Sequence, residues 1–429
     1  MPFETSDFAR RRVAVIGGGI SGMAAAHLLS KDHAVVLYEA EPRLGGHART
    51  VMAGKHGTQP VDTGFIVFNK VNYPHLTRLF DELSVPVVKS DMSFGASVRG
   101  GRLEYGLKDI RAVFAQKRNI ADPRFLNMLM DVLRFNAHAL DHADNPLMTI
   151  RELLERLDLG AWFRDYYLLP ISGAIWSTPT RGILDFPAQA LLRFFENHAL
   201  LSHTGQHQWY TVAGGSVQYV DRLRAAMTAA GVDLRLGAPV AGVRRTAAGV
   251  QVRAGGTEWE PFDEVIFATH SDDTLRLLSD ATAEETAALS AVTYQPNRAV
   301  LHSDPSVMPK RRAAWASWVY IEPDEPEAPI DITYWMNSLQ PIPNDDPLFV
   351  TLNGNRPLRD EFVHDVVTFR HPVFDLAAHR GVTALRAMNG ARGTWFAGAW
   401  MRNGFHEDGF ASAVDVVDAM RRRVGAVAA

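Results

Sequence analysis

Three glycines near the start of the chain have the spacing that a dinucleotide phosphate site requires. Gly17, Gly19 and Gly22 form G-x-G-x-x-G between the apolar run Val13–Ile16 and the Ala- and Leu-rich stretch Met23–Leu29. The first glycine permits a tight turn, the second lets the backbone approach a pyrophosphate, and the third lets a helix pack close to a sheet. The helix N-terminus adds N–H groups and partial positive charge for the phosphates. These residues predict a dinucleotide-binding turn.

An acidic residue follows at the distance where such a site binds a ribose hydroxyl. The apolar stretch Ala34–Tyr38 indicates a second buried parallel strand, and Glu39 comes directly after it. A glycine-rich turn in another kind of α/β unit is the alternative. The elements nevertheless occur in the order that dinucleotide binding needs, namely strand, turn, helix, strand and acid. This order favours a Rossmann-type unit.

A polar cluster near the C-terminus carries the groups best suited to proton transfer. His406 and Glu407 stand just before a helix that we expect over residues 410–423. Imidazole suits proton transfer because its unperturbed pKa lies near neutrality. We therefore predict that His406 moves a proton and that Glu407 orients it. The alternative is that Glu407 complements the helix dipole and that His406 fills a surface turn.

Composition narrows the class of protein. The chain of 429 residues is longer than a domain with a single hydrophobic core usually is. Its content of 47% hydrophobic and 21% charged residues is typical of a globular protein. A net charge of −4 gives no electrostatic case for a nucleic-acid partner. No apolar run has the length of a transmembrane helix, and the start lacks the apolar core of a signal peptide. We expect a cytoplasmic protein with at most peripheral membrane contact.

The chain contains no cysteine, which excludes disulfides, thiolate metal sites and a flavin linked through a cysteine thioether. The sixteen histidines show no H-E-x-x-H spacing, so we predict no metal.

The order of the expected elements predicts discontinuous domains in an α/β chain. Strand–helix alternation occurs at the start, in the middle and at the end, with two dissimilar insertions between. We expect a Rossmann-type cofactor domain and an inserted mixed α+β substrate domain. The cofactor domain would comprise residues 10–85, 205–288 and 386–425, and the substrate domain residues 86–204 and 289–385.

The ordered set of motifs resembles the flavin-containing amine oxidoreductase superfamily, which includes amine oxidases, protoporphyrinogen oxidases and phytoene desaturases. The motifs are Gly17-x-Gly-x-x-Gly, Glu39, Arg43-Leu-Gly-Gly, Asp62-Thr-Gly, Pro239-Val, Phe267-Ala-Thr and Phe396-Ala-Gly followed by Asp408-Gly. The resemblance covers the whole cofactor domain. It implies an FAD-dependent oxidoreductase with non-covalent FAD, because the second glycine pair and the C-terminal motif have no use in a nicotinamide site.

The resemblance also implies roles for matching residues. Glu39 would bind the adenosine ribose, and the backbone of Val240 the adenine. The remaining FAD contacts would come from the glycine turn with its helix start, from the second glycine pair, from the turn after Asp62, and from the last strand and helix. These residues are Gly17, Gly19, Ile20, Ser21, Gly22, Ala40, Arg43, Gly45, Gly46, His47, Thr63, Gly64, Phe65, Gly398, Asp408, Gly409 and Phe410.

Further sequence motifs resemble those of a bacterial subgroup whose members are encoded beside cyclopropane-fatty-acid-synthase-like methyltransferases. They include Asn72-Tyr-Pro, Ile175-Trp-Ser-Thr-Pro and Gly404-Phe-His-Glu-Asp-Gly-Phe. Three positions depart from amine oxidases: His47 replaces an arginine, Ala399 replaces an acid, and Arg298 falls close to their flavin-side lysine. The resemblance to the subgroup and the missing lysine favour a lipid substrate over an amine, with the neighbouring methyltransferase as candidate partner.

We therefore expect an FAD-dependent oxidoreductase that transfers hydride from a fatty acyl chain (methyl-branched, unsaturated or cyclopropane) to flavin N5. Candidate pocket residues are Trp176, Phe186, Phe194, Phe195, Trp315, Trp318, Trp335 and Trp400. Three alternatives stay open: a small-amine or amino-acid oxidase, a redox-neutral flavin isomerase, and a non-catalytic flavoprotein that presents lipid to the methyltransferase.

Overall fold

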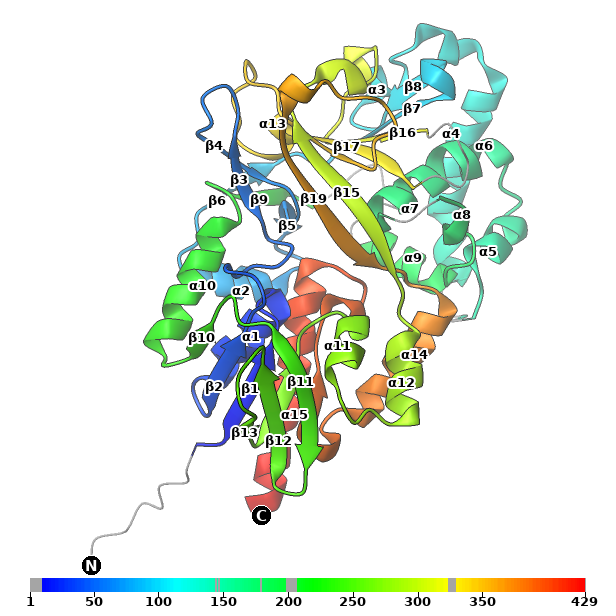
Figure 1. Cartoon of the computed structure of the whole chain (residues 1–429). Coiled ribbons are helices and arrows are strands. Elements are labelled where there is room, and N and C mark those ends of the chain that lie inside the picture. Colours follow the sequence, from blue (N-terminus) through cyan, green and yellow to red (C-terminus); the bar gives the residue numbers. More distant parts are fainter. Residues whose placement is uncertain are drawn as a thin grey trace, which may run out of the picture. The chain divides into compact units, whose positions relative to one another are not determined.

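The computed structural model describes residues 10–142, 145, 147–177, 180–197, 207–322 and 329–428. The chain folds into two compact units (Figure 1). Unit 1 consists of Met1–Ala48, Tyr219–Val292 and Ala378–Ala429, and unit 2 of Arg49–Gln218 and Thr293–Ala377. Both units are discontinuous; the first segment of unit 1 ends at Ala48, where the expected cofactor domain extends to residue 85, and its second segment begins at Tyr219, where the expected one begins at residue 205.

Unit 1 is built on a five-stranded parallel sheet in the order β10-β2-β1-β14-β20. Its strands are β1 (Arg12–Ile16), β2 (Ala34–Tyr38), β10 (Asp233–Arg235), β14 (Glu264–Phe267) and β20 (Thr394–Phe396). The central strands are short apolar runs because both faces of a parallel sheet are buried; Val13–Ile16 and Glu264–Phe267 are buried throughout. This topology confirms the predicted Rossmann-type α/β fold.

The helices of unit 1 include two that pack against each other at the glycine turn, α1 and α15 (blue and red in Figure 1). A three-stranded antiparallel sheet also belongs to this unit. The helices are α1 (Ile20–Leu29), α10 (Val217–Ala229, in unit 1 from Tyr219), α11 (Ser271–Leu277), α12 (Ala283–Ser290), α14 (Leu376–Met388, from Ala378) and α15 (His406–Ala428), and the strands are β11 (Val240–Thr246), β12 (Gly249–Ala254) and β13 (Glu260–Phe262).

The last helix begins earlier than the sequence indicates. We expected it over residues 410–423, whereas α15 starts at His406. The early start is stabilised by Asp408, whose carboxylate accepts a hydrogen bond from the backbone N–H of Phe405 at 2.9 Å, the reciprocal half of a capping box. His406 and Glu407 therefore lie in the first helical turn and not before it.

Unit 2 contains a seven-stranded mixed sheet in the order β19-β15-β18-β17-β16-β7-β8, in which only the β16–β7 pair of the described ladders is parallel. In one smaller sheet β3 pairs with β4, and in another β9 lies between β5 and β6 and pairs with both. The strands are β3 (Thr50–Ala53), β4 (Gln59–Asp62), β5 (Val67–Asn69), β6 (Val87–Ser90), β7 (Phe94–Val98), β8 (Leu103–Gly106), β9 (Trp209–Val212), β15 (Tyr294–His302), β16 (Trp318–Ile321), β17 (Asp331–Trp335), β18 (Phe349–Leu352) and β19 (Val363–Pro372).

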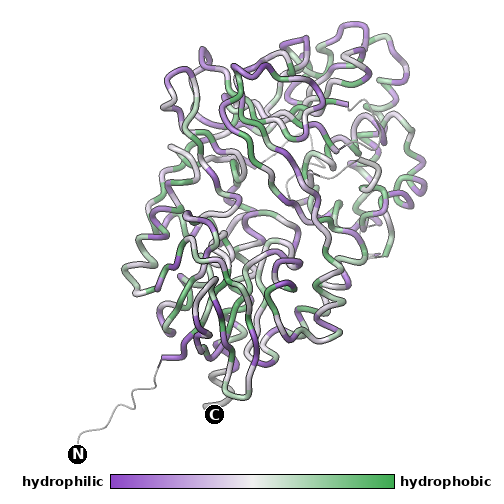
Figure 2. Tube along the Cα trace, viewed as in Figure 1, coloured by the Kyte–Doolittle hydropathy of each residue, from purple (hydrophilic) through white to green (hydrophobic). Residues whose placement is uncertain are grey.

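Most helices of unit 2 lie between residues 110 and 197. They are α2 (Pro74–Glu82), α3 (Ile110–Val113), α4 (Pro123–His138), α5 (Ile150–Arg156), α6 (Ala161–Phe163), α7 (Leu169–Trp176), α8 (Thr180–Ile183), α9 (Ala188–Asn197) and α13 (Met336–Leu339). Thr149 and Glu152 form a capping box at the start of α5. Among the described residues, no helix combines the length and apolarity needed to cross a bilayer; hydrophilic and hydrophobic residues are interspersed along the helices (Figure 2).

Candidate functional site

The glycine turn between β1 and α1 has the three-part geometry expected from its sequence. Gly17 has φ +106°, and a Cβ there would lie 2.9 Å from the carbonyl oxygen of Ala268. A Cβ at Gly22 would lie 1.8 Å from the carbonyl oxygen of Gly17. By contrast, a Cβ at Gly19 would meet no atom within 4 Å. Gly17 and Gly22 are thus required by the protein's own packing, whereas Gly19 leaves room for a ligand at the start of α1, where N–H groups favour phosphate.

The second glycine pair packs directly on the first turn. The N–H of Gly45 donates to the carbonyl of Gly18 at 2.9 Å, and a Cβ at Gly46 would lie 3.1 Å from the Cα of Gly19. The guanidinium of Arg43 donates to the carbonyls of Gly46 and Ala48 at 3.1 and 3.2 Å. Arg43, expected to bind the cofactor, therefore shapes the backbone of this turn.

Glu39 lies at the carboxyl end of β2, beside the glycine turn. Its carboxylate accepts hydrogen bonds from the N–H of Gly18 at 2.5 Å and of Glu41 at 2.8 Å. The side chain is half-buried. These contacts fix the carboxylate where an acid binds the ribose of a dinucleotide, and they make Glu39 a structural part of the turn as well. Neighbouring Ala40 is exposed.

The first turn of α15 meets the first turn of α1. A Cβ at Gly409 would lie 2.7 Å from Cγ2 of Ile20 and 2.9 Å from the hydroxyl of Ser21, so only glycine permits this approach. Phe410 is buried on the inner face of α15. The first N–H groups of a helix have no partner within the helix and favour negative charge. This end of α15 thus suits the anionic edge of a reduced flavin.

Two further candidates lie on the strands of unit 1. Val240 is the first residue of β11. The N–H of Gly398, directly after β20, donates to the hydroxyl of Ser412 on α15 at 2.9 Å. This hydrogen bond ties the end of the last strand to the last helix.

Three imidazoles and a phenol gather at the same end of unit 1. The phenol oxygen of Tyr219 on α10 lies 2.7 Å from Nε2 of His406. The rings of His47 and His270 meet edge to face with centroids 5.9 Å apart. Burial lowers the pKa of His406 to about 3, with a smaller contribution from the charge of His47. Burial likewise lowers the pKa of His47 to about 4, and burial raises that of Asp408 to about 6.

Neutral imidazole is therefore the form of His406 and His47 near neutrality, and a neutral imidazole accepts a proton through one nitrogen while donating through the other. The sequence interpretation missed Tyr219 and His270. Tyr219 carries no local signal because it stands at an ordinary helix position, and His270 follows Phe267-Ala-Thr without a recognisable spacing to the other histidines.

The remaining cofactor candidates, Thr63, Gly64 and Phe65, lie in unit 2, directly after β4. The N–H of Thr63 donates to the carbonyl of Arg49 at 2.9 Å. Asp62, which precedes them, is buried and accepts hydrogen bonds from Thr50, Ser216 and Gln340. This network fixes the turn that carries the three residues.

The predicted pocket aromatics divide into three groups. Trp176, Phe186, Phe194, Phe195 and Trp318 belong to the main apolar cluster of unit 2, whereas Trp315 and Trp335 pack in a separate small cluster. Trp400 lies in unit 1, where its indole N–H donates to the carbonyl of Thr269 at 3.0 Å. The eight residues therefore belong to two clusters of unit 2 and to unit 1.

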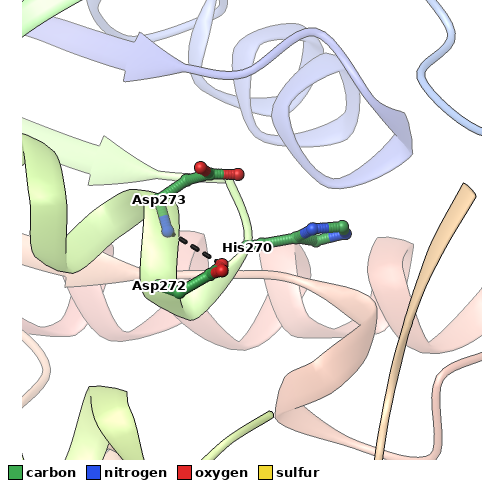
Figure 3. Close-up of side chains that lie close together, drawn as sticks. All are labelled: His270, Asp272 and Asp273. Atoms are coloured by element: carbon green, nitrogen blue, oxygen red, sulfur yellow. Dashed lines mark hydrogen bonds between the residues drawn. The ribbon is translucent and has the colours of Figure 1, made fainter. Parts of the chain in front are cut away.

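A group with metal-ligand chemistry lies at the start of α11. His270, Asp272 and Asp273 bring one ligand atom each within 4.8 Å of one another (Figure 3). The ring of His270 points away from the helix, while the Asp272 carboxylate accepts a hydrogen bond from the N–H of Asp273 at 2.9 Å (Figure 3). Asp273 also pairs with Arg276 at 2.8 Å. Acids in a first helical turn complement the helix dipole, which accounts for both carboxylates without a metal.

The comparisons with known proteins agree with this geometry. The family model described as flavin containing amine oxidoreductase matches residues 20–311. The FAD-dependent oxidoreductase dbaF of Emericella nidulans is 38% identical over 96 residues, which is 22% of this chain and 19% of that protein. The chain thus matches about a fifth of the length of this curated relative.

Solved structures share the fold over nearly the whole chain. A conjugated-linoleic-acid (CLA)-producing fatty acid isomerase from P. acnes superposes with a TM-score of 0.69 at 15% identity, covering 95% of this chain and 98% of that one. Cyclohexylamine oxidase from Brevibacterium oxydans gives 0.67 at 15% identity, covering 96% and 100%. At these identities the likeness establishes the fold alone.

Proposed function

The chain belongs to the family of flavin-containing amine oxidoreductases, with FAD as cofactor, and on this basis we propose that it oxidises a fatty acyl chain. The acyl chain would be methyl-branched, unsaturated or cyclopropane-containing. Bound FAD would supply the electron chemistry, as the acceptor of the substrate's hydride. The protein's residues bind the cofactor, hold the acyl chain and move the proton.

The observation that carries the choice of an apolar substrate is the state of the buried acids of unit 2. A buried amine-binding pocket needs an acceptor for its ammonium group, because an unpaired buried charge is costly. Every buried carboxylate among the described residues of this unit already accepts hydrogen bonds from its own chain. The five are Asp62, Glu104, Asp131, Asp304 and Asp331.

The main apolar cluster of unit 2 supports the same choice. Trp176 packs against Phe186 and Phe194 with ring centroids 6.2 and 5.4 Å apart. Within the described part of the chain, the indole nitrogen of Trp318 and the hydroxyl of Ser172 are buried without a hydrogen-bond partner. An apolar lining with a few polar atoms is the usual composition of a site for an apolar ligand, whose polar end those atoms orient.

His406 is the residue we assign to proton transfer. It lies in the first turn of α15, the helix start suited to the flavin. Burial lowers its pKa to about 3, away from the near-neutral value for which the sequence favoured it, so the ring would act as a neutral imidazole that releases one proton while taking up another. Tyr219 holds the ring through the 2.7 Å hydrogen bond. Glu407 is buried beside it and would orient the ring or complement the helix dipole.

A second candidate function is a redox-neutral isomerase of the same substrate class. The structural likeness to the fatty acid isomerase from P. acnes favours it. In that case the flavin would return to its starting state in each turnover, and the product would have the same oxidation level as the substrate.

Anaerobic mixing of the FAD-loaded protein with phospholipids tests the proposal. Unsaturated, methyl-branched and cyclopropane acyl chains should bleach the flavin absorbance, and a panel of small amines should not. Mass analysis separates the two lipid activities, since oxidation removes two hydrogens and isomerisation none. Bleaching by amines alone would overturn the acyl assignment. Lipid binding without bleaching or product would instead indicate a flavoprotein that presents lipid to a methyltransferase.

A further inference from the structure

A cavity of about 630 Å³ lies beside β20, the edge strand of the parallel sheet of unit 1. Trp395 and Phe396 of this strand line the cavity and are buried. The charged residues of the lining are exposed and come from three separate segments, namely the end of α14, the residues after β20, and α15 (the two helices are orange and red in Figure 1). They are Arg386, Arg402, Arg422, Arg423, Asp415 and Asp418.

Two of these arginines form no ion pair within the described ranges. The guanidinium of Arg386 donates to the backbone carbonyl of Met401, and that of Arg423 donates to the carbonyl of Gly390 at 2.5 Å. Partial burial and the positive charge of Arg402 lower the pKa of Arg386. The protein therefore destabilises the charged form of this side chain, and an anion bound beside Arg386 would offset that cost.

The aspartates of the lining do not neutralise all four arginines. Asp415 pairs with Arg402 at 2.7 Å. Asp418 stands four residues before Arg422 on α15, a spacing that places the two side chains on the same side of the helix. Among the residues that the structure describes, Asp418 forms no ion pair of its own. Four arginines and two aspartates leave the lining with a net charge of +2.

This charge and volume indicate the chemistry of a ligand. Guanidinium groups bind phosphate oxygens through several converging N–H donors. A phosphate monoester carries a charge of about −1.5 to −2 at neutral pH, which matches the surplus of the lining, whereas a carboxylate would neutralise only half of it. The cavity has the size of a small-molecule site, so it has room for the organic part of a small ester as well as for its phosphate.

We propose that this cavity binds a small phosphate monoester, whose phosphate is held by Arg386 together with Arg422 and Arg423. None of the lining residues is among the candidate FAD contacts, so the site is distinct from the glycine turn between β1 and α1. The proposal does not depend on the proposed oxidation of an acyl chain.

Calorimetric titration of the FAD-loaded full chain with inorganic phosphate and with glycerol 3-phosphate tests the site. Loading with FAD fills the dinucleotide site, so the measured binding reports on another place. Both probes should bind, and their Kd should rise as salt is added. Acetate should bind at least tenfold more weakly than glycerol 3-phosphate, because it carries one charge and two oxygens.

Three variants separate a ligand-binding role of Arg386 from a structural one. Arg386→Gln should raise the Kd for glycerol 3-phosphate at least tenfold, since charge-assisted hydrogen bonds are lost. Arg380→Gln is the matched control, because Arg380 is exposed on the same helix but does not line the cavity; its Kd should equal that of the wild type. Asp418→Asn should lower the Kd severalfold, because it removes a negative charge from the lining.

Retained FAD absorbance and an unchanged circular dichroism spectrum establish that each variant is folded. Arg422→Gln, at an exposed helix position, replaces Arg386→Gln should the latter fail to fold.

Four results would overturn the proposal. The first is a wild type that binds neither phosphate probe at millimolar concentration. The second is an equal Kd for the wild type and Arg386→Gln. The third is equal weakening by Arg386→Gln and Arg380→Gln, which would show attraction by the general charge of the helix rather than by a site. The fourth is acetate that binds as tightly as glycerol 3-phosphate, which would exclude selection for phosphate.

Discussion

The phenol oxygen of Tyr219 lies 2.7 Å from Nε2 of His406, and this hydrogen bond joins α10 to the first turn of α15. Tyr219 is fully buried, and its ring meets the imidazole edge to face with centroids 5.6 Å apart. A neutral imidazole carries one proton, so at this contact one partner donates and the other accepts. Tyr219 therefore fixes the orientation of the ring that we assign to proton transfer, and its hydroxyl can act as donor or acceptor toward Nε2.

Removal of the Tyr219 hydroxyl should slow turnover while leaving the cofactor bound. Tyr219→Phe keeps the buried ring and deletes the hydrogen bond, and loss of such an orienting partner costs about 10- to 100-fold in comparable sites. Stopped-flow measurement of flavin reduction by the lipid substrate should show that decrease with FAD content unchanged. A variant that reduces as fast as the wild type would leave Tyr219 with a packing role only.

Removal of the His406 imidazole should have the larger effect. His406→Ala should retain FAD and slow flavin reduction roughly 10²-fold or more, because general acid–base catalysis contributes that much. Since burial holds the pKa of His406 at about 3, the wild-type rate should show no inflection near pH 6.5 from this residue. Release of FAD by the variant would assign His406 to cofactor binding instead.

Two glycines of the same turn should respond differently to one added methyl group. Gly22→Ala should destabilise unit 1, since its Cβ would lie 1.8 Å from the carbonyl oxygen of Gly17. Gly19→Ala should leave thermal stability of the FAD-free protein unchanged, because its Cβ meets no atom within 4 Å and its φ of −74° suits any residue. Titration with FAD should nevertheless show weakened binding for Gly19→Ala. Equal FAD affinity would remove Gly19 from the phosphate site.

Loss of the Glu39 carboxylate should weaken FAD binding. A hydrogen bond involving a charged group is worth about 1.5–3 kcal/mol, so Glu39→Ala should raise the Kd for FAD roughly 10- to 150-fold. Glu39→Gln is the comparison variant: its single amide oxygen can accept from the N–H of either Gly18 or Glu41, whereas the two carboxylate oxygens accept from one each. An unchanged Kd for both variants would show that Glu39 serves the turn alone.

Glu260 should make unit 1 sensitive to acid. Hydrogen bonds from Arg235, and further ones from Tyr38 and Arg12, lower its pKa to about 2. Because the folded-state pKa lies below the ordinary value of 4.5, the stabilisation is fully present above pH 4.5 and is lost as the pH falls toward 2. At pH 7, Glu260→Gln should lower the free energy of unfolding by about 1 kcal/mol, because solvent screens the ion pairs of this partly exposed carboxylate. Chemical denaturation at pH 7 and pH 3 should show a smaller difference at the lower pH.

Local patterns in the sequence were enough for the elements of the cofactor unit. The structure of about thirty residues is specified locally: the apolar strand at Val13–Ile16, the glycine turn after it and the strand that ends before Glu39. A turn, a helix start and a strand each depend on neighbours in the chain. The capping box at Thr149 and Glu152 is equally local. The family follows from the order of such motifs along the chain.

The first residue of α15 could not be predicted correctly from the local sequence. Gly404 and Gly409 suggested a turn through residue 409, yet the helix begins at His406, where Asp408 accepts from the N–H of Phe405 and Gly409 packs against Ile20 of α1. The capping bond that stabilises this start is local, whereas the packing of Gly409 on Ile20 joins residues almost four hundred positions apart and could not be read from the local sequence.

The sequence by itself determined the dinucleotide turn and the family, since the first depends on short-range geometry and the second on motif order. Only the tertiary structure decided that Tyr219 and His270 join His47 and His406, that the eight candidate pocket aromatics separate into three groups, and that arginines from three segments line one cavity of unit 1. The physical reason is the same in each case. Side-chain partners and exposure are set by which distant segments pack together, and no spacing along the chain encodes that packing.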